Sequence, residues 1–137
     1  MQYVNATNLP WVLACMEQVV KREVEYALTF ASIAPSNESP WNYIRGFFRA
    51  GKTYADFPEV KEGVLKIKMT VGGQESSHLH NLLAEINEHE GTEESLNEAI
   101  NILQRLRNEL DSVRAQYWEG RLRRTTQRLS EVVNGQA

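Results

Sequence analysis

With 137 residues, 42% of them hydrophobic, the chain is long enough for one modest core and too short to predict two domains. Its 15 basic and 18 acidic residues leave a formal net charge of -3, which excludes an overall electrostatic footprint for nucleic acid or anionic lipid. Cys15 is the only cysteine, so an internal disulfide is excluded and a cytoplasmic location is expected. The apolar run from Trp11 to Met16 is too short to span a bilayer, so no membrane insertion is expected.

Apolar residues recur at spacings of three and four residues, and no segment shows a sustained alternation of apolar and polar residues. We therefore expect an all-α fold. The first helix is predicted from about Pro10 to about Ala34. Its predicted apolar stripe consists of Met16, Val20, Val24, Ala27, Leu28 and Ala31. The second helix is expected to start with Ser39 as its cap and Pro40 in its first turn, and to end near Gly51. A short connection between the two predicts an antiparallel helical hairpin.

Four further helices are predicted along the rest of the chain. Their starts and breaks are marked by Pro58, by Gly72 and Gly73, by Gly91 with Thr92, and by Asp111 as the cap of the last helix. Their predicted apolar residues are Val60, Val64, Ile67 and Val71 in the third, Leu79, Leu82, Leu83 and Ile86 in the fourth, Leu96, Ala99, Ile100, Leu103 and Leu106 in the fifth, and Val113, Tyr117, Trp118, Leu122, Leu129 and Val133 in the sixth. Six helices with short loops indicate stacked up-and-down hairpins, either a bundle or a right-handed helical-repeat stack.

No residue pattern in the chain predicts a catalytic site. Neither Cys15 nor any serine has a general base at a recognisable spacing, and Gly72-Gly73 lacks the lysine that a phosphate-binding loop requires. His78, His80 and His89 fit no zinc motif, so no metal ligand is predicted and solvated helix positions explain all three.

Segment 35–44 joins a helix stop, a helix start and a bulky aromatic residue. Trp41 is predicted in the core, while Asn42, Tyr43 and Arg45 lie on neighbouring helix faces and are candidate contacts with a partner chain. The last helix is rich in arginine. Its basic residues either balance the acidic segment 85–109 within the molecule or bind an acidic partner surface; they are Arg114, Arg121, Arg123, Arg124 and Arg128.

Two segments carry a resemblance to a known family. Residues 21–28, followed by Ile-Ala-Pro-Ser-Asn-Glu-Ser-Pro-Trp-Asn-Tyr-Ile-Arg-Gly at 33–46, resemble a repeat of the protein prenyltransferase α-subunit family. Residues 111–118 resemble the closing segment of the α subunit that protein farnesyltransferase shares with type I geranylgeranyltransferase. The residues matching the repeat motif are Pro35, Asn37, Glu38, Trp41, Tyr117 and Trp118. The similarity runs from about 20 to 124, is weaker from 54 to 90, and is absent from 1 to about 16.

The resemblance implies stacked antiparallel helical hairpins that wrap a β subunit in a heterodimer. That partner would hold the zinc ion, with magnesium in the holoenzyme, and the isoprenoid diphosphate and CaaX protein would bind through the complex. No cofactor would be bound by this chain. In the family, a lysine and tyrosines of earlier repeats contact the diphosphate, in Lys-Asn-Tyr-His-like segments that this sequence lacks. The motif at Trp41 also lacks the following histidine, so we expect a docking role and no activity of the chain alone.

The resemblance divides the chain into an unmatched segment 1–16, one helical-repeat domain at 17–133 and a tail at 134–137. The chain is expected to be an α-subunit fragment, a truncated gene model or a diverged relative. Because a missing half would remove the helices on which the first hairpin stacks, exposed apolar surface is predicted near Trp11 and Val12. The rival hypothesis is a freestanding tetratricopeptide-like scaffold that binds a peptide. A Rab-type α subunit is disfavoured by residues 111–118. Farnesyl and geranylgeranyl substrates are not distinguished, because that choice lies mainly in the β subunit.

Overall fold

The computed structural model describes residues 10–49 and 53–135, and every regular element within them is helical, which confirms the all-α prediction. No helix in these two ranges is both long and apolar enough to cross a bilayer. The α-helices are α1 (Pro10–Ile33), α2 (Glu38–Arg49), α3 (Pro58–Lys68), α4 (Ser77–Glu90), α5 (Glu93–Arg105) and α6 (Ala115–Val133). The short elements are the 3-10 turns η2 (Tyr54–Asp56) and η4 (Ser112–Arg114) and the π-helical turn η3 (Leu106–Leu110).

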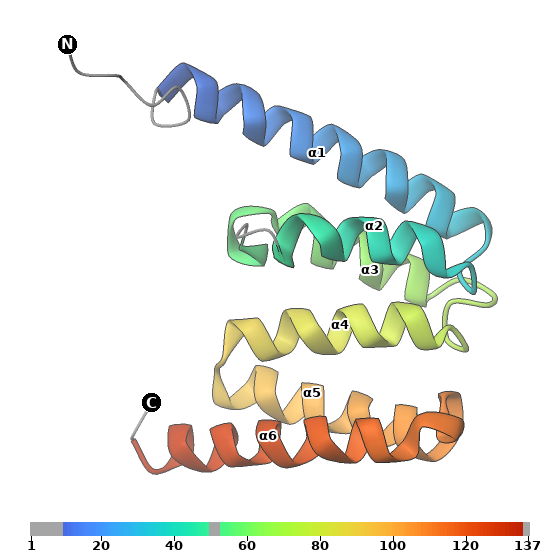
Figure 1. Ribbon diagram of the computed structural model, residues 1–137, viewed down its shortest axis with the longest axis vertical. Helices are drawn as coiled ribbons and strands as arrows, with labels where there is room; N and C mark the ends of the chain where they lie inside the picture. Colours follow the sequence, from blue (N-terminus) through green and yellow to red (C-terminus); the bar gives the residue numbers. More distant parts are fainter. Residues whose placement is uncertain (1–9, 50–52, 136–137) are drawn as a thin grey trace.

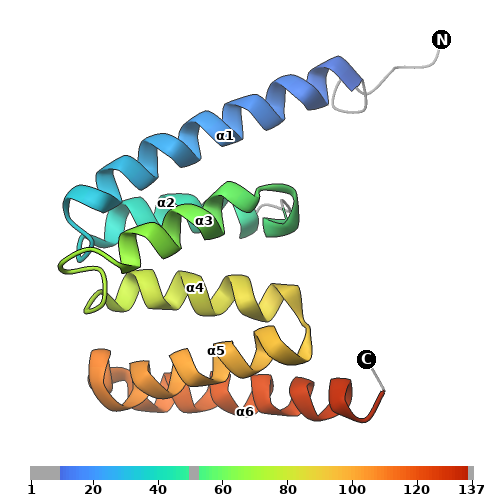
Figure 2. The same cartoon turned by 180° about the vertical axis from the view of Figure 1, so that it is seen from behind.

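Consecutive helices run in opposite directions and form a stack of hairpins (Figure 1). Helix α1 lies at one end of the stack, and α5 and α6 lie at the other. Helices α3 and α5 lie behind α2 and α6 in Figure 1 and in front of them in Figure 2. The stack therefore has two layers, and α2, α4 and α6 can contribute side chains to one common face.

The turn between α1 and α2 is fixed by one backbone carbonyl. The Trp41 indole Nε1 donates to the carbonyl oxygen of Pro35 at 2.8 Å, and the Ser76 hydroxyl donates to the same oxygen at 2.5 Å. Trp41 is fully buried, which confirms its predicted place in the core. Because Ser76 also caps α4 through the amide of Leu79, this carbonyl joins the first hairpin to the start of the fourth helix.

Helix α2 starts two residues earlier than the sequence predicts. The amide of Ser39 donates to the Asn37 side chain at 3.1 Å, so Asn37 supplies the cap and Ser39 does not. Glu38 opens the first turn, and its carboxylate accepts a hydrogen bond from Asn42 at 2.8 Å. An acid there also suits the positive end of the helix dipole.

The core joins residues from all six α-helices, as the three and four spacing predicts. Five predicted core residues are exposed instead, and two of them lie outside the last helix. Met16 is 38% exposed, because the inner stripe of α1 begins only at Val20. Val71 is fully exposed, because α3 ends at Lys68 and Val71 lies in the following turn. His80 departs in the opposite sense: it was expected to be solvated, yet it is buried.

The last helix also starts differently from the prediction. Asp111 makes no side-chain cap; its carboxylate instead accepts from the Trp118 indole Nε1 at 3.1 Å. Residues 112–114 form the 3-10 turn, so the helical period does not extend back to Val113, which is 95% exposed. Tyr117 and Val133 are exposed as well, and Trp118 and Leu122 supply the buried face.

The predicted exposed surface at the N-terminal end is present. Trp11 is 68% exposed, whereas the side chain of Val12 lies outside the described part of the chain. Helix α1 continues without a break across the 16–17 boundary drawn from the resemblance.

Candidate functional site

A polar groove of about 720 Å³ lies on the face shared by α2, α4 and the start of α6. Residues at positions i and i+3 of each row line it, a spacing that keeps side chains on one helix face. The lining rows are Asn42, Arg45 and Arg49 on α2, His78 and Asn81 on α4, and Arg114 on η4 with Tyr117 on α6. Glu85 and Arg121 follow at position i+7 of the last two rows and do not line the groove. We call this surface the polar groove.

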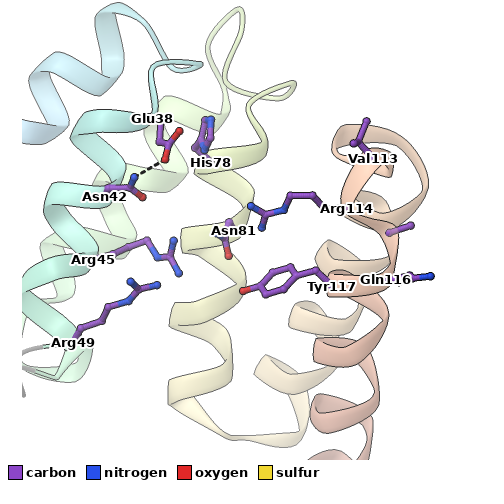
Figure 3. A pocket seen from close by; sticks show the side chains of 11 residues that line it. Glu38, Asn42, Arg45, Arg49, His78, Asn81, Val113, Arg114, Gln116 and Tyr117 are labelled. Carbon is purple, nitrogen blue, oxygen red and sulfur yellow. Dashed lines mark hydrogen bonds between the residues drawn. The ribbon is translucent and has the colours of Figure 1, made fainter.

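The polar groove is wide open between its walls. In Figure 3, Arg45 and Arg49 extend from α2 on one side, and Arg114 and Tyr117 extend from the opposite side toward Asn81. The remaining lining residues are Glu38, Asn42, His78, Val113, Ala115 and Gln116. Nitrogen and oxygen atoms from three helices thus converge on one concavity without filling it.

Arg45 is held in place before any partner binds. Its Nε lies 3.0 Å from Glu85 Oε2, and the Tyr54 hydroxyl donates to the same carboxylate oxygen at 3.1 Å. Burial, with the negative charge of Glu85, raises the pKa of Tyr54 far above its ordinary value, so the hydroxyl stays protonated and remains a donor. Arg45 therefore offers a fixed guanidinium edge while its charge is already balanced.

The opposite wall is ordered by aromatic contacts. The Arg114 guanidinium carbon lies 4.6 Å from the ring centre of Tyr117 and 5.0 Å from that of Trp118. Its Nε also lies 3.2 Å from Asp111, the residue that accepts from Trp118. These contacts fix the direction in which Tyr117 points, and they leave that ring 46% exposed at the edge of the polar groove.

The floor of the polar groove is tied down by Arg121. Its guanidinium donates to the Asn81 side chain at 2.5 Å and forms an ion pair with Glu88. Arg121 is 7% exposed and its guanidinium carbon lies 5.5 Å from the Trp118 ring centre. The sequence left open whether the arginines of the last helix balance acidic residues within the molecule or bind an acidic partner. Arg121 balances an acidic residue within the molecule.

Arg49 differs from the other arginines of the polar groove. It is exposed, and it makes no ion pair with any residue in the described ranges. Its charge is therefore the part of the groove that a carboxylate on a partner could meet without breaking an existing pair.

Of the three predicted interface residues, the structure brings two into the polar groove. Asn42 and Arg45 line it, whereas Tyr43 points to the other side of α2, where its hydroxyl donates to Glu23 at 3.0 Å. That hydrogen bond raises the pKa of Tyr43. Sequence reasoning missed Arg49, which the i+7 spacing from Asn42 could have indicated, and Asn81, which only the packing of α4 beside α2 reveals.

The histidines do not come together. His80 Nδ1 lies 2.7 Å from the Ser76 carbonyl, and Arg105 lies 3.1 Å from its Nε2, so both ring nitrogens are engaged within the fold. Burial lowers the pKa of His80, which keeps the ring neutral and able to accept from Arg105. Among residues 10–49 and 53–135, no three histidine, cysteine or acidic side chains are placed to hold a metal ion.

Comparison with known proteins adds to this geometry. No protein-family model matches the chain. The protein farnesyltransferase/geranylgeranyltransferase type-1 subunit alpha of Dictyostelium discoideum is 31% identical to it over 100 residues. The match covers 73% of this chain and 30% of that protein, so it spans less than a third of the relative's length. A likeness of this extent supports the resemblance indicated by the repeat motif.

Proposed function

We propose that this chain is a helical-repeat part, or a diverged relative, of the α subunit of a heterodimeric protein prenyltransferase, and that it docks and supports the β subunit. The complex would transfer a farnesyl or geranylgeranyl group to the cysteine of a carboxyl-terminal CaaX motif in the cytoplasm. The observation that carries this proposal is the polar groove, whose two walls are formed by the two segments that resemble the family: α2 and the start of α6.

The polar groove suits a protein partner better than a small substrate. It is open and polar, whereas pockets for small ligands enclose most of the ligand in apolar walls. Arginine, tyrosine and asparagine supply the directional contacts that protein interfaces favour, and Arg45, Arg114 and Tyr117 are held in place in advance. Ordering these side chains on folding lowers the entropy lost on binding.

Charge indicates where the partner would contact the groove first. Arg45 and Arg114 are paired with Glu85 and Asp111, so Arg49 carries the unbalanced positive charge of the α2 wall. A glutamate or aspartate of the β subunit opposite Arg49 would form an ion pair at the end of the row without displacing either existing pair.

The proposed role is structural because the groove lacks the groups that the reaction needs. The family's diphosphate contacts come from a lysine and tyrosines of earlier repeats, and Trp41-Asn42-Tyr43 is followed by Ile44 rather than histidine. Zinc and magnesium would be held by the β subunit or the holoenzyme. Without the β subunit, the chain would therefore bind neither metal nor isoprenoid diphosphate and would transfer nothing.

The test is co-expression of the chain with candidate farnesyltransferase and type I geranylgeranyltransferase β subunits, followed by pull-down and a prenylation assay on a CaaX peptide. We expect retention of one β subunit without turnover. Arg49→Glu should weaken that retention at least tenfold, because it puts an acid in place of the arginine of the α2 wall that pairs with no acid among the described residues. The matched control is Arg123→Glu, an exposed arginine of α6 outside the groove, which should leave retention unchanged.

Three results would contradict the proposal in different ways. Turnover would show that the earlier repeats are dispensable. Equal loss of binding in both arginine variants would place the contact outside the polar groove. Failure to bind either β subunit, with capture of a free peptide instead, would favour the tetratricopeptide-like scaffold.

A further inference from the structure

Helix α1 has two apolar faces, and the fold covers only one of them. The inner face is buried against α2 and α3 and consists of Val20, Val24, Ala27 and Ala31. A second row follows at alternating spacings of three and four, rotated about 100° around the helix. This row, which we call the outer seam, consists of Met16, Val19, Glu23, Tyr26, Phe30 and Ile33. Its aromatic and aliphatic members are all exposed, Tyr26 by 62% and Ile33 by 76%.

The outer seam lies at an end of the molecule. Helix α1 is the terminal element of the stack in both views, and none of the other helices drawn lies beyond it (Figures 1 and 2). Beside the seam, α1 and α2 enclose a mostly apolar groove of about 430 Å³ lined in part by Phe30, Pro40 and Tyr43. The Tyr26 and Phe30 rings also meet edge to face at 4.9 Å, which orders the aromatic part of the surface.

We propose that the outer seam is a self-association surface, on which the α1 helices of two copies of this chain pack antiparallel about a two-fold axis. A three and four alternation over 18 residues is the pattern by which two helices interlock along a seam about 25 Å long. This inference does not rest on the proposed function, because no residue of the outer seam lines the polar groove.

The side chains of the outer seam complement one another only in the antiparallel arrangement. With the two-fold axis between residues 24 and 25, Met16 meets Ile33 of the second copy, Val19 meets Phe30, and Glu23 meets Tyr26. The Met16–Ile33 and Val19–Phe30 layers are thus apolar throughout, and Glu23 meets the hydroxyl-bearing Tyr26. In a parallel pair, Glu23 would face Glu23 of the second copy, and like charges in one layer oppose association.

The polar layer at Glu23 fits the same arrangement. Its Oε2 already accepts from the Tyr43 hydroxyl at 3.0 Å, so the second carboxylate oxygen can accept from the Tyr26 hydroxyl of the second copy. Arg22, which neighbours the seam, brings a positive charge close to that carboxylate from the other helix. Such a layer fixes the register of the pair, since a one-turn slip would place the carboxylate against an apolar residue.

The first test is the mass of the whole chain in solution by sedimentation velocity. We expect twice 15.7 kDa, falling to 15.7 kDa on dilution. Val19→Glu should weaken the pair at least tenfold, because it puts a second acid in the seam. The matched control is Val71→Glu, the same exchange at an exposed residue in the turn after α3, which should leave the mass unchanged.

Both variants keep their helix content if the substituted residues are as exposed as the structure shows, which far-ultraviolet circular dichroism checks. A wild-type chain that stays at 15.7 kDa at every concentration would overturn the proposal, as would equal dissociation by Val19→Glu and Val71→Glu. If the chain is a monomer, the outer seam would instead bind a helix of a different protein.

The second test fixes the direction of packing by disulfide formation in a Cys15→Ser background. In the antiparallel pair, Met16 of one copy lies beside Ile33 of the other, whereas two identical positions lie about 25 Å apart. Mixing Met16→Cys and Ile33→Cys chains should therefore give a crosslink between the two variants, and neither variant alone should crosslink. Crosslinking of Met16→Cys with itself would overturn the antiparallel arrangement.

Discussion

The two ends of the stack differ in what they show to the solvent. At the C-terminal end, the outer face of α6 is polar, with exposed residues that include Arg123, Arg124 and Gln127. At the N-terminal end, the outer face of α1 is the aromatic and aliphatic outer seam. A helical-repeat stack needs a polar terminal element to stop further stacking. Helix α6 therefore has the polar outer face of a terminal repeat, and we call its end of the stack the closed end. Helix α1 exposes an apolar outer face, and we call its end the open end.

The ends differ inside as well. Helices α4, α5 and α6 enclose Trp118 and several buried polar residues whose groups are hydrogen-bonded, such as Arg121, His80 and Asn87. Helix α1 contributes a four-residue apolar stripe, and its only hydrogen bond from a side chain to α2 is the exposed Tyr43–Glu23 contact among the described residues. We infer that the C-terminal three helices hold most of the stability and that α1 opens first.

The largest effect should come from Trp118, which is 1% exposed and packs between α6 and the rest of the stack. Trp118→Ala leaves a cavity and leaves the Asp111 carboxylate without its indole donor, and should cost about 3 to 5 kcal/mol of unfolding free energy. Urea denaturation measures it. Trp11→Ala at the open end, where the side chain is 68% exposed, serves as the matched control and should change the midpoint little. Similar losses for both tryptophans would end the contrast between the two ends.

Removal of the Arg121 side chain should be next in size. Arg121→Ala would leave Glu88 and Asn81 without their guanidinium donor in a mostly buried place, and should cost about 2 to 3 kcal/mol. At the open end, Tyr43→Phe removes the hydroxyl that binds Glu23 in an exposed place, and should leave the denaturation midpoint unchanged. A larger loss for Tyr43→Phe than for Arg121→Ala would reverse the ranking of the two ends.

A third prediction concerns the turn between α4 and α5, at the closed end of the stack. Gly91 ends α4 with φ of +69°, and a Cβ there would meet the Arg128 guanidinium at 3.1 Å. Gly91→Ala should therefore cost about 1 to 2 kcal/mol, because an L side chain is strained in the left-handed region. The control is Gly46→Ala on the exposed face of α2, where a Cβ meets nothing within 4 Å and alanine favours the helix. Destabilisation by Gly46→Ala of the same size would show that α2 carries strain the structure does not reveal.

How far the sequence predicted the molecule follows from these same residues. Periodicity found the six helices, because an amphipathic stripe is local and needs no knowledge of the partner element. It failed at Val113 and Val71, where a 3-10 turn and a helix end interrupt the period that places a side chain inward. It also misplaced the caps: Asp111 and Ser39 have good capping side chains, but Trp118 and Asn37 determine which bonds form.

Only two of the residues that line the polar groove were named from the sequence, for a related reason. Asn42 and Arg45 were named from one helix, and their helical spacing put them on one face. Asn81 and Tyr117 join them because α4 and α6 pack beside α2, which is a property of tertiary packing that local spacing does not encode. Tyr43 was named because aromatic residues on a helix face are favoured at interfaces; as the residue next to Asn42 it points about 100° away from it, and its hydroxyl binds Glu23 instead of entering the groove.

The smallest effect should be a pH dependence that belongs to the closed end. Burial lowers the pKa of His80 below its ordinary 6.5. Just below pH 6.5, the imidazole therefore binds a proton in the unfolded chain and stays neutral in the folded chain. Stability from this group is complete above pH 6.5 and is lost as the pH falls from 6.5 toward the lower pKa of the folded state. Urea denaturation from pH 7.5 to 5.5 should therefore show a falling midpoint that is flatter in His80→Gln. His78→Gln, at the rim of the polar groove, should keep the wild-type slope, and the same slope in all three chains would remove His80 as its source.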